Sequence, residues 1–216
     1  IKKTKSITKD KQSLIAFVGA PWTLLIYLYN LKGQKNLKNK IAIKNKNEVK
    51  MVLKTLDEFL KLHIIQQKNA GAEIIQIFDS WAGLIQEDDL DEYCFKPNQS
   101  LVKFCKENNI PSICFPKGLK DNYKKFLEQV RPDAINIDHE INPQWAATNL
   151  KGICVQGGMN PELLLKSENE VLKETEKYLE IFKNIPYIFN LGHGILPQTN
   201  PNIIKKIVEK VNLITK

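Results

Sequence analysis

The strongest constraint on the fold is a pattern that recurs six times along the chain. Each repeat is a short, almost continuously apolar run, followed by a polar or glycine-bearing segment. Strands that are covered on both faces need such runs, because neither face meets water. The sequence therefore predicts six buried strands, at residues 14–18, 74–78, 112–115, 134–137, 153–155 and 187–189.

Helices are expected between these strands. One stripe of apolar residues at spacings of three and four predicts a long amphipathic helix. Ser167 and Glu170 have the spacing of a capping box, and Asn200-Pro201 is typical of a helix start. Six strands that alternate with helices predict a parallel sheet with right-handed crossovers. The stripe consists of Val52, Leu53, Leu56, Leu60 and Ile64.

The segments that follow the strands hold most of the residues with chemical potential. Ligand sites of parallel α/β proteins form at the carboxyl ends of the strands, so these segments are expected on one rim. Periodicity alone is also compatible with a doubly wound open sheet. No GxGxxG follows any strand, which argues against a Rossmann dinucleotide site. Residues 32–50, rich in lysine and asparagine, are expected to form a solvated excursion.

The charge balance is basic, with 32 lysines and arginines against 24 acidic residues and a net charge of +8. Such a balance can indicate nucleic acid, an anionic membrane or a polyanionic small molecule as partner. Arg131 is the only arginine, however, and proteins that read nucleic acid depend on arginine for bidentate contacts. We therefore expect no nucleic-acid partner, and we assign most lysines to solvated helix faces.

Two further patterns bear on the compartment. The four cysteines (Cys94, Cys105, Cys114 and Cys154) form no CxxC and no close pair, which favours free thiols in a reducing cytoplasm. Between Lys11 and Lys32 lie 20 consecutive uncharged residues, enough to cross a bilayer. The Gly19-Ala20-Pro21 step would break such a helix, so a strand, a turn and a helix are expected there, with no membrane partner.

The histidines differ in their surroundings. His193 lies between two glycines, which let the backbone bend and a ligand approach, so its imidazole is a candidate donor to an anion or a carbonyl group. His139, after Asp138, could be a ligand, an acid–base group or a hydrogen-bonded rim residue. His63 is expected to pack on its helix or face solvent. The Gln156-Gly157-Gly158 step could hold a phosphate or form a tight turn.

Metal and nucleophile motifs are not found. The sequence has no HxxxH, HExxH, HxC or CxxC spacing, so no metal site is expected. Ser80 has no GxSxG elbow around it, and its hydroxyl is better suited to hydrogen bonding than to nucleophilic attack.

Four segments resemble one known family. Residues 17–24 with Tyr27 resemble the GAPWT segment of the uroporphyrinogen decarboxylases, and residues 71–83 are similar to that family's next strand and loop. Residues 155–157 with Pro161 and residues 189–195 with Pro197 resemble its QGNLDP and NLGHG segments. The matches run in order and at matching spacing over essentially the whole chain.

This resemblance implies an α/β fold of the (β/α)8 TIM-barrel type. About six of the eight βα units would be present, with residues 1–216 as one partial barrel domain. The family removes carboxyl groups from the four acetate side chains of uroporphyrinogen III, giving coproporphyrinogen III in haem biosynthesis. It needs no metal or organic cofactor and implies a tetrapyrrole substrate, a cytoplasmic location and a homodimer. Tyr27, Ser80 and His193 match its substrate-binding positions, and we expect them to converge in one cleft.

Departures from the family pattern limit what the chain is expected to do alone. The RQAGRY motif, whose arginines grip carboxylates, is absent, and so is the downstream aspartate that holds the pyrrole N–H groups, which leaves the catalytic residues of this chain unknown. The chain also begins at Ile1 rather than Met. It is therefore expected to be the carboxyl-terminal two-thirds of a decarboxylase, neither a stable closed barrel nor active by itself.

Two alternatives stay open. One is an inactive or non-enzymatic tetrapyrrole-binding fragment of the family. The other is a related corrinoid-linked methyltransferase, which shares the barrel but binds zinc through a His-x-Cys pair that this sequence lacks. Gly158-Met159-Asn160 also stands where the family usually has Asn-Leu-Asp.

Overall fold

All six predicted strands are present, and all the strand pairs within each part of the chain are parallel. The computed structural model describes residues 1–8, 12–32 and 46–214. It divides the chain into two compact units, Ile1–Asp133 and Ala134–Lys216. Within each unit the strand order follows the chain order, as expected for successive β/α units. The expectation of a single domain stays a prediction.

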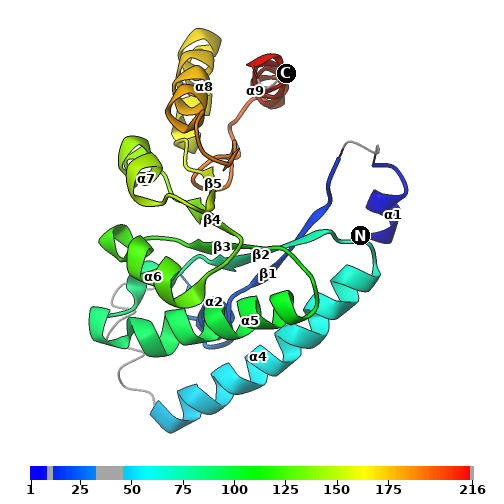
Figure 1. Cartoon of the computed structure of the whole chain (residues 1–216), viewed down its shortest axis with the longest axis vertical. Helices are drawn as coiled ribbons and strands as arrows, with labels where there is room; N and C mark the ends of the chain where they lie inside the picture. Colours follow the sequence, from blue (N-terminus) through cyan, green and yellow to red (C-terminus); the bar gives the residue numbers. More distant parts are fainter. Residues whose placement is uncertain (9–11, 33–45, 215–216) are drawn as a thin grey trace. The chain divides into compact units, whose positions relative to one another are not determined.

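The first unit is a three-stranded sheet with helices on one face (Figure 1). Helices α2, α4 and α5 pack against one another and against the sheet. The strands are β1 (Ile15–Gly19), β2 (Ile74–Asp79) and β3 (Ser112–Pro116). The helices are α1 (Lys2–Lys5), α2 (Pro21–Leu28), α4 (Lys46–Asn69), α5 (Lys96–Glu107) and α6 (Tyr123–Val130). Short helical turns are η1 (Ala82–Leu84), η2 (Glu87–Asp89), η3 (Asp91–Phe95) and η4 (Lys120–Asn122).

The second unit repeats the arrangement with three more parallel strands. Helices α8 and α9 lie side by side, and α7 packs on α8 (Figure 1). The strands are β4 (Ala134–Ile137), β5 (Cys154–Gly157) and β6 (Tyr187–Ile188). The helical segments are α7 (Pro143–Asn149), η5 (Pro161–Leu165), α8 (Glu168–Phe182) and α9 (Pro201–Ile214).

The long uncharged segment folds as predicted. Strand β1 ends at Gly19, and α2 begins at Pro21, where the missing N–H of proline removes no hydrogen bond. No helix in the described ranges is long and apolar enough to cross a membrane. The four cysteines are free, as expected, and three of them are buried.

The long helix α4 buries the predicted stripe only in part. Leu53, Leu60 and Ile64 are buried, whereas Val52 and Leu56 are half-buried. The predicted excursion over residues 32–50 lies mostly outside the described residues, at 33–45. From Lys46 onward the prediction was wrong, because these residues already belong to the first turns of α4.

Strand β1 departs from the expectation that every strand is covered on both faces. Ala16 and Val18 are buried, but Ile15 is exposed and Phe17 is 66% exposed. Side chains alternate between the two faces of a strand, and only the face toward the helices is covered at β1. The continuous apolar run therefore did not reveal that one face of this strand is open.

The capping box at the start of α8 is formed as predicted. The backbone N–H of Glu170 donates to Ser167 Oγ, and the N–H of Ser167 donates to the Glu170 carboxylate at 3.1 Å. We expect Ser167→Ala to lower the free energy of unfolding by about 1 kcal/mol, because a helix N–H loses its acceptor. Urea denaturation measures the change, and Ser13→Ala, at an exposed serine outside any helix, is the control. Equal stability of the two variants would contradict the role of the cap.

Candidate active site

The carboxylate of Asp79 is the centre of a buried polar cluster at the carboxyl end of β2. Its side chain is fully buried. Oδ1 accepts from Thr23 Oγ1 of α2 at 2.9 Å, and Oδ2 accepts from Asn98 Nδ2 of α5 at 3.0 Å. The thiol of Cys94 is a third hydrogen-bond partner. One carboxylate thus links two helices to the end of a strand.

Ser80 follows Asp79 directly and is half-buried. The residue on its other side, Trp81, is also held by α2, because its carbonyl accepts from the indole Nε1 of Trp22 at 3.0 Å. Trp22 is itself buried and stacks on Tyr93 with ring centroids 5.4 Å apart. Both neighbours of Ser80 are therefore hydrogen-bonded to the first turn of α2.

Tyr27 lies on the same helix, one turn beyond Thr23. It is 47% exposed, and the ammonium group of Lys32 lies 5.7 Å from its ring centroid. The exposed ring places a phenolic hydroxyl where a ligand can reach it. Since α2 carries Tyr27 and both contacts to the neighbours of Ser80, the two predicted site residues of the first unit share one support.

Burial changes the acid–base behaviour of this cluster. Desolvation raises the pKa of Asp79 to about 6, although Thr23, Asn98 and Cys94 act in the opposite direction by hydrogen bonding to it. Burial also raises the pKa of the Cys94 thiol well above its usual value, and the nearby Asp79 charge adds to the effect. Asp79 is the last residue of β2, and the sequence placed it in one of the polar strand-end segments, but no sequence pattern predicted that its carboxylate is fully buried.

His193, in the second unit, is exposed on the segment that follows β6. Its Nδ1 accepts a hydrogen bond from the N–H of Gly194 at 2.7 Å. A neutral ring whose Nδ1 accepts must carry its proton on Nε2. His193 can therefore offer an Nε2–H donor to an anion or a carbonyl group, as its sequence context suggested.

The segment carrying His193 is paired with the segment after β5. The N–H of Gly192 donates to the carbonyl of Met159 at 2.8 Å, and the N–H of Met159 donates to the carbonyl of Asn190. Gly192 also packs so closely on the backbone of Asp138 and His139 that a Cβ would overlap the His139 nitrogen. Three strand-end segments of this unit therefore meet, and close approach explains the glycine at 192. A side chain at Gly194 would meet open space.

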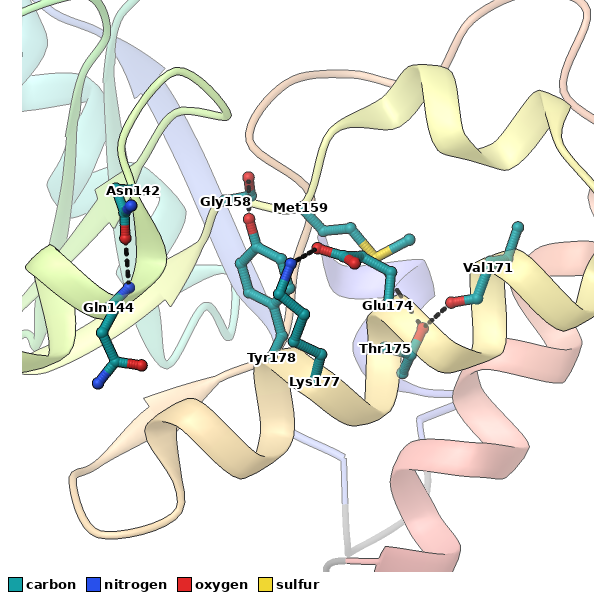
Figure 2. Close-up of polar contacts among 9 residues, drawn as sticks. All are labelled: Asn142, Gln144, Gly158, Met159, Val171, Glu174, Thr175, Lys177 and Tyr178. Carbon is teal, nitrogen blue, oxygen red and sulfur yellow. Dashed lines mark hydrogen bonds and ion pairs between the residues drawn. The ribbon is translucent and has the colours of Figure 1, made fainter.

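The Gly158-Met159-Asn160 departure is held by α8 (Figure 2). Tyr178 Oη donates to the carbonyl of Gly158 at 3.1 Å, and Met159 is fully buried beside Thr175. Asn160 caps η5 by accepting from the N–H of Glu162. Gln156 and Gly157 belong to β5, and Met159 forms a β-bridge with Leu191, so the tight-turn interpretation of 156–158 was wrong. The next helical turn starts only at Pro161, so the 156–158 step does not lie at a helix start either.

The other two histidines have distinct surroundings. His63 is exposed on α4, stacks on Phe59 and contacts Gln67 at 2.7 Å, which confirms the packing interpretation. Asp138 is buried and accepts from the N–H of Glu140. Nδ1 of His139 is buried, with no hydrogen-bond partner among the described residues, so the hydrogen-bonded interpretation is not confirmed for that atom. The described residues hold no group of three metal ligands.

Successive parallel β/α units whose strand order follows the chain order within each unit are typical of the α/β-barrel class of proteins. The chain is similar over its full length to a solved methyltransferase from Methanosarcina mazei, with a TM-score of 0.81, 17% identity and 63% of that chain covered. This likeness concerns the fold, and it supports the (β/α)8 barrel type with six units present.

Sequence relatives identify the family. The family model for uroporphyrinogen decarboxylase (URO-D) matches residues 1–213. The chain is 37% identical over 213 residues to the uroporphyrinogen decarboxylase of Rickettsia bellii, and 34% identical over 216 residues to that of Wolbachia pipientis wMel. These matches cover 97% and 99% of the chain but only 63% and 62% of the relatives. The chain belongs to the uroporphyrinogen decarboxylase family.

The three predicted substrate residues are divided between the two units. Tyr27 and Ser80 share the support of α2 in the first, and His193 lies with the strand-end segments of the second. Their convergence in one cleft stays a prediction. Asp79 is the residue that sequence reasoning passed over, although it stands within one of the matching segments.

The raised pKa of Asp79 makes stability depend on pH. Well below pH 4 the carboxyl is protonated in both the folded and the unfolded state, so its burial costs little. As the pH rises from 4 to 6 the unfolded chain loses this proton first, and the contribution of Asp79 to stability is lost. The difference in unfolding free energy between wild type and Asp79→Asn should therefore fall by about 2 kcal/mol between pH 4 and pH 7. Urea titrations across this range measure it, and a pH-independent difference would contradict the assignment.

Proposed function

We propose that this chain takes part in the decarboxylation of the four acetate side chains of uroporphyrinogen III to give coproporphyrinogen III, in haem biosynthesis. The main support is that Ser80 and His193 lie on segments after strands, and Tyr27 on the helix after β1, within the matched family region. The basic net charge of +8 suits a substrate that carries many carboxylates. A cytoplasmic location, a homodimer and the absence of a nucleic-acid partner belong to the same proposal.

The chemistry places a positioning task on the protein. Protonation of a pyrrole carbon makes the ring a cationic electron sink. The bond between the acetate methylene and its carboxylate then breaks, carbon dioxide leaves, and the electron pair neutralises the ring. Proton uptake at the former methylene carbon completes a methyl group, and loss of the first proton from the ring carbon restores the pyrrole, so that one proton is consumed for each carbon dioxide released. The protein must orient the macrocycle and stabilise the cation, so the rate acceleration depends on positioning and on electrostatic stabilisation.

The three residues suit that task in different ways. Tyr27 and Ser80 offer hydroxyl donors from two elements that the Asp79 and Trp81 contacts hold together. His193 offers an Nε2–H donor to an acetate or propionate, while its Nδ1 is held by the N–H of Gly194. Neither role needs a metal or an organic cofactor.

A substitution at His193 tests the binding role. In the complete gene product, we expect His193→Ala to lower kcat/KM for uroporphyrinogen by roughly 10- to 150-fold, because a charge-assisted contact worth about 1.5–3 kcal/mol is lost. Steady-state assays of coproporphyrinogen formation measure the change. His63→Ala, which removes an exposed imidazole from α4, is the control and should retain activity. Unchanged kinetics in His193→Ala would refute the role.

A chelator arm of the same assay separates the proposal from its metal-dependent alternative. Decarboxylation should continue in the presence of a strong chelator of divalent metals. Activity that is abolished by the chelator and restored by zinc would favour a methyltransferase-like protein instead.

The 216-residue chain by itself is expected to lack turnover. We propose that residues 1–216 are part of a single barrel domain, and the carboxylate-gripping arginines of the family motif are not among them. Arg131 does not replace them, because it ends α6 and its Nε donates to the carbonyl of Glu128. Purified residues 1–216 should therefore form no coproporphyrinogen under conditions in which the full-length Rickettsia bellii relative is active. Turnover by a monodisperse monomer that unfolds cooperatively would prove this wrong.

A further inference from the structure

The residues on either side of Ser80 are fixed by side chains that no substrate needs to touch. Asp79 is fully buried, and its main partners, Thr23 and Asn98, are also buried. The cluster is therefore closed to solvent, while Ser80 beside it is half-exposed. Its influence on a ligand must act through the residues that it holds in place.

The contacts converge on the loop after β2 from two helices. Thr23 Oγ1 reaches Asp79 from α2, and Asn98 Nδ2 reaches it from α5 while also donating to the carbonyl of Cys94 at 2.8 Å. The carbonyl of Asp79 accepts from the N–H of Lys117, which adds the end of β3. A shift of Asp79 would therefore move the start of the Ser80 loop relative to α2.

We propose that Asp79 is a positioning residue that holds Ser80 in one fixed geometry relative to helix α2 through its hydrogen bond with Thr23. This inference rests on the proposed function, since it assigns a role in substrate positioning. It adds a residue that touches neither substrate nor solvent. The carboxylate is suited to the task because each of its two oxygens accepts from a different helix, whereas an amide would offer one acceptor oxygen and one donor nitrogen.

The burial of the charge supports this role. Removing a carboxylate from water costs free energy, and here the cost appears as the raised pKa of Asp79. A buried acid that lowers stability at neutral pH is typical of a site selected for geometry. The two thiols near it, Cys94 and Cys114, have their pKa values raised by burial and stay uncharged at neutral pH.

A double-mutant cycle tests the coupling in the complete gene product. Thr23→Val keeps the shape of the side chain and removes the hydroxyl donor, whereas Thr23→Ser keeps the donor. We expect Thr23→Val to lower kcat/KM for uroporphyrinogen at least tenfold, chiefly through kcat, and Thr23→Ser to stay within about twofold of wild type. In a Ser80→Ala background, Thr23→Val should cost less than about twofold, because the residue through which it acts is already gone.

Asp79→Asn is the second variant and serves if Thr23→Val does not fold. The amide retains one acceptor oxygen, so one of the two helix contacts is lost and the same non-additivity with Ser80→Ala is expected. Asp133→Asn is the matched control. Asp133 also accepts two hydrogen bonds, from Ser112 N–H and Oγ, but it does so at the amino end of β3. Its kcat/KM should stay within about twofold of wild type in both backgrounds.

The possible results separate this inference from the function on which it rests. Equal losses in the wild-type and Ser80→Ala backgrounds would show that the Thr23–Asp79 pair acts independently of Ser80, and would overturn the inference while leaving the decarboxylase function intact. The same holds if Asp133→Asn loses as much activity as Asp79→Asn. An unmodified gene product that forms no coproporphyrinogen would overturn the proposed function, and the positioning role with it.

Discussion

The hydrogen bonds to the buried Asp79 carboxylate are the interaction on which the first unit depends. Strand β2 ends there, α2 is bound through Thr23, and α5 is bound through Asn98. An unpaired charge at this depth would cost several kcal/mol, so each donor is needed. The same contacts determine where Ser80 lies, because its preceding residue cannot shift without breaking them. Packing of the unit and placement of a candidate substrate residue thus have one physical cause.

In the second unit, backbone contacts hold the segment that carries the candidate residue His193. The segment that carries His193 pairs through its peptide groups with Met159, and Gly192 packs against the backbone after β4. Helix α8 supports this arrangement from behind, because Tyr178 donates to the Gly158 carbonyl and Met159 is buried beside Thr175. The Gly158-Met159-Asn160 departure from the family pattern therefore has a structural role in this chain.

The family suggests a reaction for this chain, whereas the fold alone does not. The names of the relatives indicate the reaction of the family. The chain spans about 63% of the length of the Rickettsia bellii relative, so decarboxylation by this chain is an inference to be tested. The structural likeness to a methyltransferase concerns the fold only, since barrels of this class support many chemistries through their strand-end segments. What distinguishes the decarboxylase proposal is the set of side chains that those segments carry.

Several features could be predicted from the sequence because their causes are local. Apolar runs gave the six strands, Pro21 marked the start of α2, and the Ser167–Glu170 spacing gave the capping box. The candidate residues Tyr27, Ser80 and His193 were predicted from the resemblance of short sequence segments to the family motifs. Periodicity over a few residues is enough for such features, since it reflects contacts between near neighbours.

Other features were decided by contacts between residues distant in the chain. One face of β1 is exposed because only its other face is covered by helices. The burial of Asp79 depends on helices α2 and α5, which begin 58 residues before it and 17 residues after it. The glycines beside His193 are predicted from the sequence to allow bending and the approach of a ligand, yet at Gly192 the close backbone of His139 explains the glycine. The chain by itself determined which residues form strands, helices and candidate contacts. Only the tertiary structure decided which of them are buried together, because desolvation and long-range hydrogen bonds exist only after the chain has folded.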